Sequence, residues 1–242
     1  MKAFILAAGL GTRLKPWTDS HPKALVPVGG IPMLERVVEK LCSHGMEDIT
    51  VNVHHFADQV RDFISKKGWR LHISDESPLL LETGGALLHA SQFLKSDSEP
   101  ILIHNVDILS NADFKALEQA HYNRNADITL LVSPRESSRK LIFDNQWRLK
   151  GWHSLAADEF RPAGFNPSSS DLELAFSGIY IVSPAVLDFM VKEGWSGRFS
   201  IMDFMLASIH KLRIFGLNQS DLELIDIGKP DALHRAEILF HN

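Results

Sequence analysis

Residues 1–28 read MKAFILAAGLGTRLKPWTDSHPKALVPV, and this stretch decides the fold prediction. The apolar run 3–8 leads directly into Gly9-Leu10-Gly11, which predicts a buried strand that delivers the chain into a tight loop. Glycines let backbone N–H groups turn toward an anion, and Arg13 and Lys23 add positive charge. The stretch is therefore interpreted as a loop that holds phosphate.

The glycine loop is not specific by itself. Position 14 is Leu14, so the third glycine of a dinucleotide fingerprint is missing, and the Gly-Lys-Ser or Gly-Lys-Thr of a P-loop is missing too. A strand-to-loop turn that binds nothing is the alternative. Thr12 and Arg13, together with Lys23 in a segment expected to be extended, 22–27, favour the phosphate loop.

Composition limits the classes of function. The 242 residues are 45% hydrophobic and 23% charged, as in an ordinary globular chain with a sizeable core. The net charge of −5 argues against a nucleic-acid partner, although a pocket can still be positive. Cys42 is the only cysteine, so no disulfide framework is expected. With no apolar run long enough for a bilayer and no cleavable leader, we expect a cytoplasmic protein without a membrane partner, as a monomer or small homo-oligomer.

Strand and helix patterns alternate through the first half of the chain. This order predicts an α/β fold with a mostly parallel sheet covered by helices on both faces. Strands are expected at 3–8, 48–53, 69–73, 100–104 and 126–132, and helices at 33–42, 56–64, 86–90 and 114–121.

The pattern becomes irregular after about residue 133. A hairpin is expected at 140–151, and residues 152–171 are interpreted as a long loop. We interpret the chain as one domain with a smaller, irregular C-terminal portion. Further strands are expected at 172–182, 212–217 and 222–225, and helices at 184–190, 199–210 and 230–240.

Four features follow predicted strands and should converge on one cleft, because ligands bind beyond the carboxyl ends of strands in such sheets. They are the Gly9–Arg13 loop, the segment 82–85, Asp107 and Asp226. Two carboxylates together with substrate phosphates suit Mg²⁺. The alternative is that each aspartate caps the following element, although Asp113 and Asp231 lie closer to predicted helix starts.

Two further groups of residues have open interpretations. Segment 82–85, with the sequence ETGG, can present backbone groups to a nucleobase edge, or form a helix start that Thr83 caps. Trp152, Phe160 and Phe165 can line an acceptor pocket or simply pack under a loop. The twelve histidines show no metal-ligand spacing.

These motifs resemble the signature of the sugar-phosphate nucleotidyltransferases, the nucleotide-sugar pyrophosphorylases. Within that family the chain is most similar to short N-acetylmuramate-1-phosphate uridylyltransferases and short mannose-1-phosphate guanylyltransferases, which lack the left-handed β-helix of longer relatives. The matching segments are 7–14 (AAGLGTRL), 22–28 (PKALVPV), 81–85, 105–107, 176–179 and 226–228, which together cover nearly the whole chain.

The resemblance implies a Rossmann-like three-layer sandwich with a mostly parallel mixed sheet. It implies a single catalytic domain over 1–242, with a nucleotide-binding half, 1–133, a sugar-binding half, 134–242, and no β-helix domain. It also implies roles for individual residues: Ala8, Gly9, Gly11, Thr12, Arg13, Glu82, Gly84, Gly85 and Asn105 for the nucleotide, Lys23, Ser177 and Gly178 for the sugar phosphate, Asp107 and Asp226 for Mg²⁺, and Arg13, Lys23 and Asp107 for catalysis.

The implied reaction joins an NTP and a sugar 1-phosphate into an NDP-sugar and pyrophosphate. Two alternatives stay open: a cytidylyltransferase that acts on a phosphorylated alcohol such as phosphocholine, and a catalytically inactive sensor of nucleotides or sugar phosphates.

One departure from the family pattern is the only hint of an inactive sensor. Many members have Asn-Gly-Asp where this chain has Asn105-Val106-Asp107. We expect Val106 to point away from the cleft and fill core.

Overall fold

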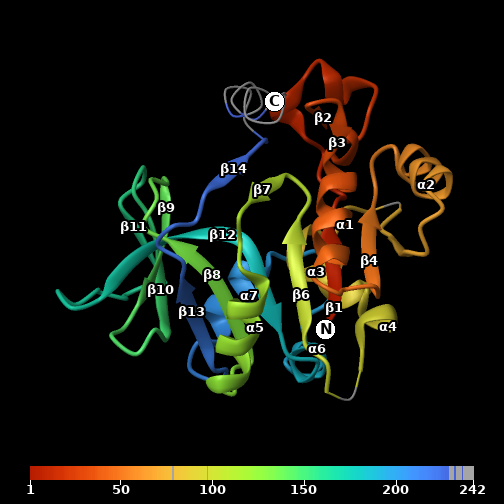
Figure 1. The fold of residues 1–242 in the computed structure, drawn as a ribbon. Helices are drawn as coiled ribbons and strands as arrows, with labels where there is room; N and C mark the ends of the chain where they lie inside the picture. Colours follow the sequence, from red (N-terminus) through yellow and green to blue (C-terminus); the bar gives the residue numbers. More distant parts are fainter. Residues whose placement is uncertain (78, 97, 229–231, 233–235, 237–242) are drawn as a thin grey trace.

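The computed structural model describes residues 1–77, 79–96, 98–228, 232 and 236, and its centre is a mixed sheet with helices on both sides (Figure 1). The strands are β1 (Lys2–Leu6), β2 (Pro27–Val28), β3 (Ile31–Pro32), β4 (Ile49–Val53), β5 (His72–Asp75), β6 (Ile101–Asn105), β7 (Ile108–Ser110), β8 (Ile128–Ser133), β9 (Arg139–Phe143), β10 (Leu149–Ser154), β11 (Glu159–Arg161), β12 (Leu172–Val182), β13 (Ile214–Asn218) and β14 (Leu224–Asp226). The helices are α1 (Met33–Ser43), α2 (Ala57–Lys66), α3 (Glu82–His89), α4 (Ser91–Leu94), α5 (Phe114–Asn123), α6 (Ala185–Lys192) and α7 (Ile201–Ser208), with 3-10 turns η1 (Thr12–Leu14), η2 (Trp17–Asp19) and η3 (Lys23–Leu25).

The main sheet has a parallel half and an antiparallel half. Its order is β11-β10-β9-β12-β6-β1-β4-β5, and β8 joins it beside β12 with β13 at its other edge. Strands β6, β1, β4 and β5 are parallel, so their carboxyl ends share one edge of the sheet. Strand β12 is antiparallel to β6 and turns the sheet into a mixed one. The predicted α/β fold with a mostly parallel mixed sheet is therefore confirmed.

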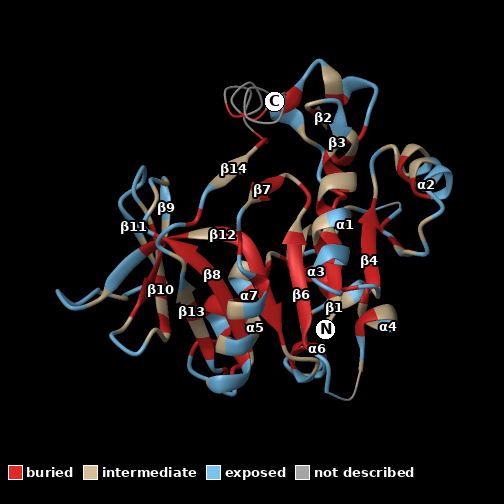
Figure 2. Ribbon diagram, viewed as in Figure 1, coloured by how far each residue is buried: buried red, intermediate tan, exposed pale blue. Residues whose placement is uncertain are grey.

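Two hydrophobic clusters fill the space on the two faces of the sheet, and Figure 2 shows the central strands as buried. Helices α3, α4, α6 and α7 contribute to one cluster, while α1, α2 and α5 contribute to the other. Successive residues of a strand point to opposite faces; accordingly Tyr180 and Val182 of β12 join the first cluster, and Ile179 and Ile181 join the second. This continuous burial explains the unbroken apolar runs of the sequence.

Local signals explain where several elements begin and end. Asp113 caps α5, since its Oδ1 accepts a hydrogen bond of 2.9 Å from Ala116 N, as the sequence predicted. The strand predicted at 69–73 is wrong at its start, because β5 begins at His72. Trp69 N still donates to Ile64 O at the end of α2, and the Trp69 ring packs on Phe63. Trp69 therefore belongs to the end of the helix.

The interpretation of 152–171 as one long loop is wrong for its first half. Strand β10 continues to Ser154 and pairs with β11 in a second hairpin. His153 stands opposite Phe160 in this pairing, and the two rings stack with centroids 3.9 Å apart. Asp158, which precedes β11, takes a positive φ of 48°. This hairpin carries no alternation of apolar and polar residues, which is why the sequence pattern did not reveal it.

The segment 22–27 is not continuously extended as predicted. Leu25 N donates to Pro22 O and Val26 N to Lys23 O, so η3 interrupts it. Thr83 is not a helix cap either, because it lies inside α3 and its hydroxyl accepts a hydrogen bond from Ile201 N. The helix predicted at 230–240, with Asp231 as its cap, lies outside the described residues.

Candidate functional site

The glycine loop after β1 is compact and rigidly held. Gly11 has a φ of +63° and precedes η1, whose Leu14 N donates to Gly11 O at 2.8 Å. Thr18 Oγ1 donates to the same carbonyl at 2.9 Å. A β-carbon at Gly11 would lie 2.8 Å from Thr18 Cγ2 and 3.0 Å from Lys23 Cβ. Only glycine fits both this conformation and this space.

Two predicted site residues, Lys23 and Asp107, are in direct contact. Lys23 Nζ donates to Asp107 Oδ2, and each side chain is only 13% exposed. Lys23 starts η3, whereas Asp107 lies in the turn after β6. The ion pair thus joins the stretch that follows the glycine loop to the carboxyl end of β6.

Gly228 marks the point where the charged groups meet. A β-carbon there would lie 2.9 Å from Asp226 Oδ1, 3.1 Å from Asp107 Oδ2 and 3.1 Å from an Nη2 atom of Arg13. The backbone holds the aspartates in place, since Ile227 N donates to Asp107 O at 3.0 Å and Gly228 N donates to Asp226 Oδ1 at 2.9 Å. The structure therefore brings Arg13, Asp107 and Asp226 together around the space of one methyl group, and Lys23 joins them through its ion pair with Asp107.

The pairing of β14 with β7 is what brings Asp226 to this point. Asp226 stands opposite Ile108, the residue after Asp107, in this two-stranded antiparallel ribbon. Figure 1 shows β14 running beside β7, outside the main sheet. Sequence reasoning placed both aspartates at strand ends but gave no signal for the ribbon, which comes from residues more than a hundred positions apart.

The donor set at this junction fits Mg²⁺. Two carboxylates are present, and the described residues contain no cluster of three or more His, Cys, Asp or Glu side chains that would form a cage made of protein alone. Mg²⁺ keeps several waters and binds through one or two carboxylates plus substrate phosphates. Asp107 and Asp226 would supply the protein oxygens, and the remaining positions would be left to phosphate and water.

A buried polar network next to the loop escaped the sequence analysis. Asn52 Oδ1 accepts hydrogen bonds from Ala7 N and Ala8 N, at 2.5 and 3.2 Å. Asn52 Nδ2 donates to Glu76 Oε1 at 2.5 Å, and Leu81 N donates to Glu76 Oε2 at 2.9 Å. The network ties the ends of β1, β4 and β5 to the start of α3. The sequence did contain a sign of this network, because Asn52 is a polar residue within the apolar run of β4.

The segment 82–85 packs against the chain itself. A β-carbon at Gly84 would lie 2.4 Å from the Phe199 ring, and one at Gly85 would lie 2.2 Å from Gly197 O. The N–H groups of both glycines donate to Phe199 O, at 2.9 and 3.1 Å. Glu82 pairs with Arg198 at 2.7 Å. The close approach that these glycines allow is therefore made by residues 197–199, and their N–H groups are already bonded.

Asn105, Ser177 and Gly178 meet at the floor of a cavity of about 360 Å³. Gly178 has a φ of +77°, and its β-carbon would lie 2.7 Å from Asn105 Nδ2. The Ser177 hydroxyl is buried and donates to Leu131 O at 2.8 Å, so it supports the floor from below. The lining residues are Leu6, Thr83, Asn105, Ile108, Arg135, Ser137, Arg139, Lys140, Leu141, Trp152, Phe176, Ser177, Gly178, Tyr180, Ser200, Ile201, Met202 and Asp226.

Of the three aromatic residues considered for an acceptor pocket, Trp152 lines this cavity. Phe160 stacks on His153, and Phe165 packs against Gly151, where a β-carbon would lie 2.8 Å from its ring. Val106 is buried in the hydrophobic cluster that contains α1 and α5. It points away from the charged junction, as the sequence analysis expected.

A larger cavity of about 730 Å³ lies on the other side of Ile108, between α1 and the β7–β14 ribbon. Its lining includes Lys40 and His104 but none of the predicted site residues. Burial lowers the pKa of Lys40 to about 8 and that of His104 to about 4. This space is separate from the cavity that contains Asn105 and Asp226.

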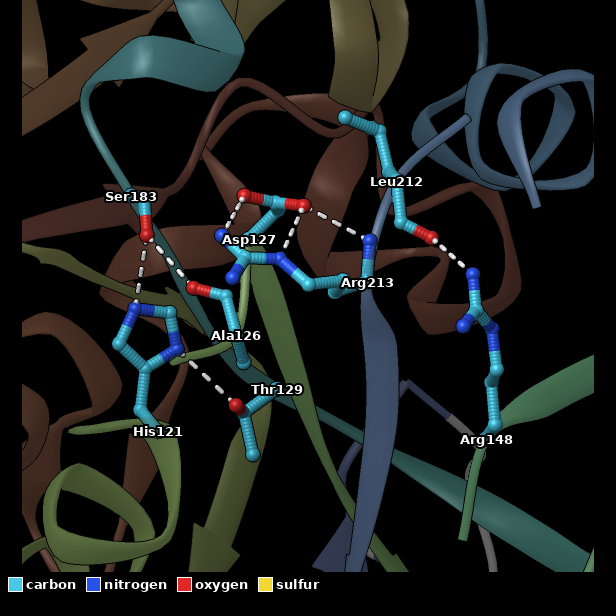
Figure 3. Close-up of polar contacts among 8 residues, drawn as sticks. All are labelled: His121, Ala126, Asp127, Thr129, Arg148, Ser183, Leu212 and Arg213. Atoms are coloured by element: carbon cyan, nitrogen blue, oxygen red, sulfur yellow. Dashed lines mark hydrogen bonds and ion pairs between the residues drawn. The ribbon is translucent and has the colours of Figure 1, made fainter. Parts of the chain in front are cut away.

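A serine and a histidine meet at the opposite end of the sheet, although the sequence gave no sign of such a pair. His121 contacts Ser183 Oγ and Thr129 Oγ1, both at 2.9 Å (Figure 3). The Ser183 hydroxyl donates to Ala126 O at 2.8 Å, so its proton is not available to the imidazole. Burial lowers the pKa of His121 to about 4. The pair therefore holds α5 to the sheet rather than forming a nucleophile and its base.

Comparisons with known proteins identify the family of the chain. The family model described as nucleotidyl transferase matches residues 2–143. An N-acetylmuramate alpha-1-phosphate uridylyltransferase from Caulobacter vibrioides is 30% identical, with 97% of this chain and 95% of that protein covered. A mannose-1-phosphate guanyltransferase from Yarrowia lipolytica is 31% identical over 78% of this chain, which spans about half the length of that relative.

Solved structures share the fold at lower identity. HddC from Yersinia pseudotuberculosis superposes with a TM-score of 0.78 at 22% identity and covers 99% of both chains. The inositol-1-phosphate CTP transferase from T. maritima superposes with a TM-score of 0.76 at 17% identity, over 99% of this chain and 95% of that one. Among the helices of the described residues, none is long and apolar enough to span a membrane.

Proposed function

Because the chain belongs to the nucleotidyl transferase family, we propose that it transfers a nucleotidyl group from an NTP to a sugar 1-phosphate and releases pyrophosphate. The single observation that carries the proposal is the charged junction, where Arg13, Lys23, Asp107 and Asp226 meet. Two cations and a two-carboxylate metal position are what a triphosphate needs. Residues 1–133 would bind the nucleotide and residues 134–242 the sugar phosphate, in a cytoplasmic enzyme that draws on the cellular NTP pool.

The reaction requires alignment more than acid–base chemistry. The acceptor phosphate is already ionised at neutral pH, so one of its oxygens can form the new bond to the α-phosphorus without a general base. The bond from the α-phosphorus to the bridging oxygen breaks, and pyrophosphate leaves with the electron pair. Holding these groups in line and neutralising their charge are the main sources of rate enhancement.

Each predicted site residue has a role in this proposal. The loop of Ala8, Gly9, Gly11 and Thr12 would surround the phosphates, and Arg13 would contact the β- and γ-phosphates. Lys23 would contact the α-phosphate or the incoming sugar phosphate. Glu82, Gly84 and Gly85 would lie near the base and ribose, and Asn105, Ser177 and Gly178 would form the floor beneath the sugar.

The metal belongs to the same proposal. Enzymes of this family generally use a divalent cation, and Mg²⁺ bound between Asp107 and Asp226 would draw negative charge from the phosphates as the bond at the α-phosphorus changes. Hydrogen bonds from Ile227 N to the Asp107 carbonyl and from Gly228 N to the Asp226 carboxylate support this proposal, because they would keep the two aspartates close to each other.

The residues that line the cavity help to decide between a sugar 1-phosphate and phosphocholine as the acceptor. A phosphocholine-type acceptor would call for an anionic or aromatic cage around its quaternary ammonium. The cavity here does have aromatic side chains in its lining, Trp152, Phe176 and Tyr180, but three cations, Arg135, Arg139 and Lys140, stand there against one carboxylate, Asp226, and would repel a quaternary ammonium. We therefore favour a sugar 1-phosphate, of the N-acetylmuramate uridylyl or mannose guanylyl type, over a phosphorylated choline. An inactive sensor is disfavoured because the full set of cations and aspartates meets at one point.

The test is pyrophosphate release from four NTPs, each combined with the 1-phosphates of mannose, glucose, N-acetylglucosamine and N-acetylmuramic acid, with Mg²⁺ present.

Asp107→Asn and Asp226→Asn should each lower turnover by about a hundredfold or more without loss of fold, because a preorganised charge is removed from the transition state. Asp221→Asn is the matched control, since this aspartate is exposed and lies away from the junction. Wild-type rates in both junction variants would overturn the site assignment, and nucleotide binding without pyrophosphate from any pair would support the sensor.

A further inference from the structure

Three cations in the acceptor cavity are unexplained by the chemistry of the transferred phosphate. Arg135, Arg139 and Lys140 all line the cavity of about 360 Å³. Within the described part of the chain, none of them forms an ion pair, although the other exposed cations often do. The lining carries one carboxylate, Asp226, which belongs to the metal position. The cavity is therefore locally positive in a chain whose net charge is −5.

Arg135 shows most clearly that the positive charges of the cavity outnumber the negative ones. Its Nη2 donates to Phe176 O at 2.7 Å and its Nη1 to Glu136 O at 3.3 Å, both neutral backbone acceptors. Its Nε is buried and has no hydrogen-bond partner among the described residues. Burial lowers the pKa of the Arg135 guanidinium, and the charge of Asp226 acts in the opposite direction. A half-buried guanidinium without an anion in contact is costly, because a buried charge is stabilised mainly by an opposite charge.

Lys140 and Tyr180 add two more polar groups to the lining of this cavity. Lys140 Nζ is held near Arg135 by a hydrogen bond of 2.6 Å to Arg135 O. The Tyr180 side chain is 1% exposed, and its hydroxyl has no partner among the described residues. Buried hydroxyls are normally bonded, so the unpaired hydroxyl of Tyr180 is a second unsatisfied polar group in a residue that lines this cavity.

The position of the cations separates them from the reacting phosphate. Asn105 ends β6, whereas Arg135 follows β8, and these two strands pair with opposite edges of β12 at residues 180–182. Lys140 lies in β9, which pairs with β12 farther along, at residues 172–174. Neighbouring strands are about 4.8 Å apart, so the backbone of β8 is about 10 Å across the sheet from that of β6. The reacting phosphate must sit near Lys23 and Asp107, and the cations would then meet the far side of the sugar.

We propose that Arg135, Arg139 and Lys140 form a second anion subsite, and that the acceptor is an acidic sugar 1-phosphate whose carboxylate binds there. This inference rests on the proposed function and narrows its substrate class. A carboxylate accepts hydrogen bonds from guanidinium and ammonium groups with strong geometric preference, and it would supply the opposite charge that the cavity lacks. The subsite discriminates against neutral sugars, because they would leave the three cations without a partner.

The test compares acceptors that differ in one carboxylate. N-acetylmuramate 1-phosphate is compared with N-acetylglucosamine 1-phosphate, and glucuronate 1-phosphate with glucose 1-phosphate, by kcat/KM for pyrophosphate release. We expect the wild type to prefer the acid in at least one pair by about tenfold or more. Arg139→Gln and Lys140→Gln should remove most of that preference, because each should lower kcat/KM for the acid much more than kcat/KM for the neutral sugar. Lys150→Gln is the control, because Lys150 lies on neighbouring β10 outside the lining.

Equal use of acid and neutral sugar in both pairs would overturn the subsite, as would an equal loss for both in the two variants. Arg135 is left intact because it also holds the Phe176 carbonyl. Failure of the proposed function has a different signature, namely no pyrophosphate with any NTP and acceptor. Calorimetric binding of the same four sugar phosphates then still decides the subsite, since the acid should bind more tightly than its neutral partner and lose that advantage in Arg139→Gln.

Discussion

At the scale of single residues, the glycine loop depends on shape as much as on charge. Gly11 has a left-handed backbone and almost no space for a side chain, whereas Gly30 shares the left-handed backbone, with a φ of +76°, but nothing lies within 4 Å of its β-carbon position. The two glycines therefore separate backbone strain from steric exclusion.

Gly11→Ala is expected to destabilise the protein by about 1–3 kcal/mol, because a left-handed alanine costs roughly 1–2 kcal/mol and its methyl group would press on Thr18 and Lys23. Nucleotide affinity should fall as well, since Lys23 would shift. Urea unfolding and calorimetric NTP binding measure the two effects. Gly30→Ala should show the strain without the loss of affinity, and equal behaviour of both variants would contradict the steric argument.

Sequence alone predicted the residues of the junction but not its geometry. Recognisable motifs contain all four residues, so they could be predicted as site residues: Arg13, Lys23, Asp107 and Asp226. The Lys23–Asp107 ion pair and the opposition of Asp226 to Ile108 arise from pairing between distant segments, which no local pattern encodes. Asn52 was missed although it is a polar residue in the apolar run of β4, because its partners Ala7, Ala8 and Glu76 come from distant segments.

At the scale of elements, strand ends are joined by side chains rather than by backbone alone. Asn52 is 3% exposed and Glu76 is 2% exposed, and together they accept hydrogen bonds from three backbone N–H groups, two just after β1 and one just before α3. Buried N–H groups without partners are strongly unfavourable. The parallel sheet thus needs this network exactly where strands give way to loops.

Asn52→Ala should cost about 2–4 kcal/mol of unfolding free energy, because it leaves Ala7 N, Ala8 N and one oxygen of Glu76 without partners. It should also weaken NTP binding, since the Ala8 backbone opens the glycine loop. Chemical denaturation and calorimetry provide the measurements. Asn145→Ala, in the exposed turn between β9 and β10, is the control and should stay within about 0.5 kcal/mol of wild type. A loss no larger than that of the control would show that the network is dispensable.

The elements themselves were predictable where periodicity was strong. Helix α1 and strand β12 match the predicted ranges closely, because one has a clear helical face and the other a long apolar run. The β10–β11 hairpin was missed since His153 and Phe160 face each other across a pair that depends on stacking rather than alternation. Short strands such as β7 and β14 exist only because they pair with each other.

At the scale of the whole molecule, two buried histidines make stability depend on pH. His104 and His121 are 1% and 3% exposed, and burial lowers the pKa of each to about 4. In the unfolded chain a histidine has a pKa of about 6.5. Between these values the unfolded state binds more protons, so stability is complete above pH 6.5 and is lost as the pH falls toward 4.

The expected loss over this range is up to about 3 kcal/mol for each histidine. Urea unfolding at several pH values measures it. His121→Gln should make the slope between pH 6.5 and 4 shallower than in the wild type, while His210→Gln, at an exposed position, should leave the slope unchanged. An identical slope in the His121 variant would show that folding does not lower the pKa of this imidazole.

The Lys23–Asp107 ion pair has a consequence for the order of events in the cleft. The protein carries its own counter-ion there, so the carboxylate is neutralised before any metal arrives. In the proposed mechanism, a divalent cation that binds Asp107 Oδ2 would displace the ammonium of Lys23, which starts η3 and whose side chain borders Gly11. Metal binding would then free Lys23 to contact the triphosphate, so the two events would be coupled.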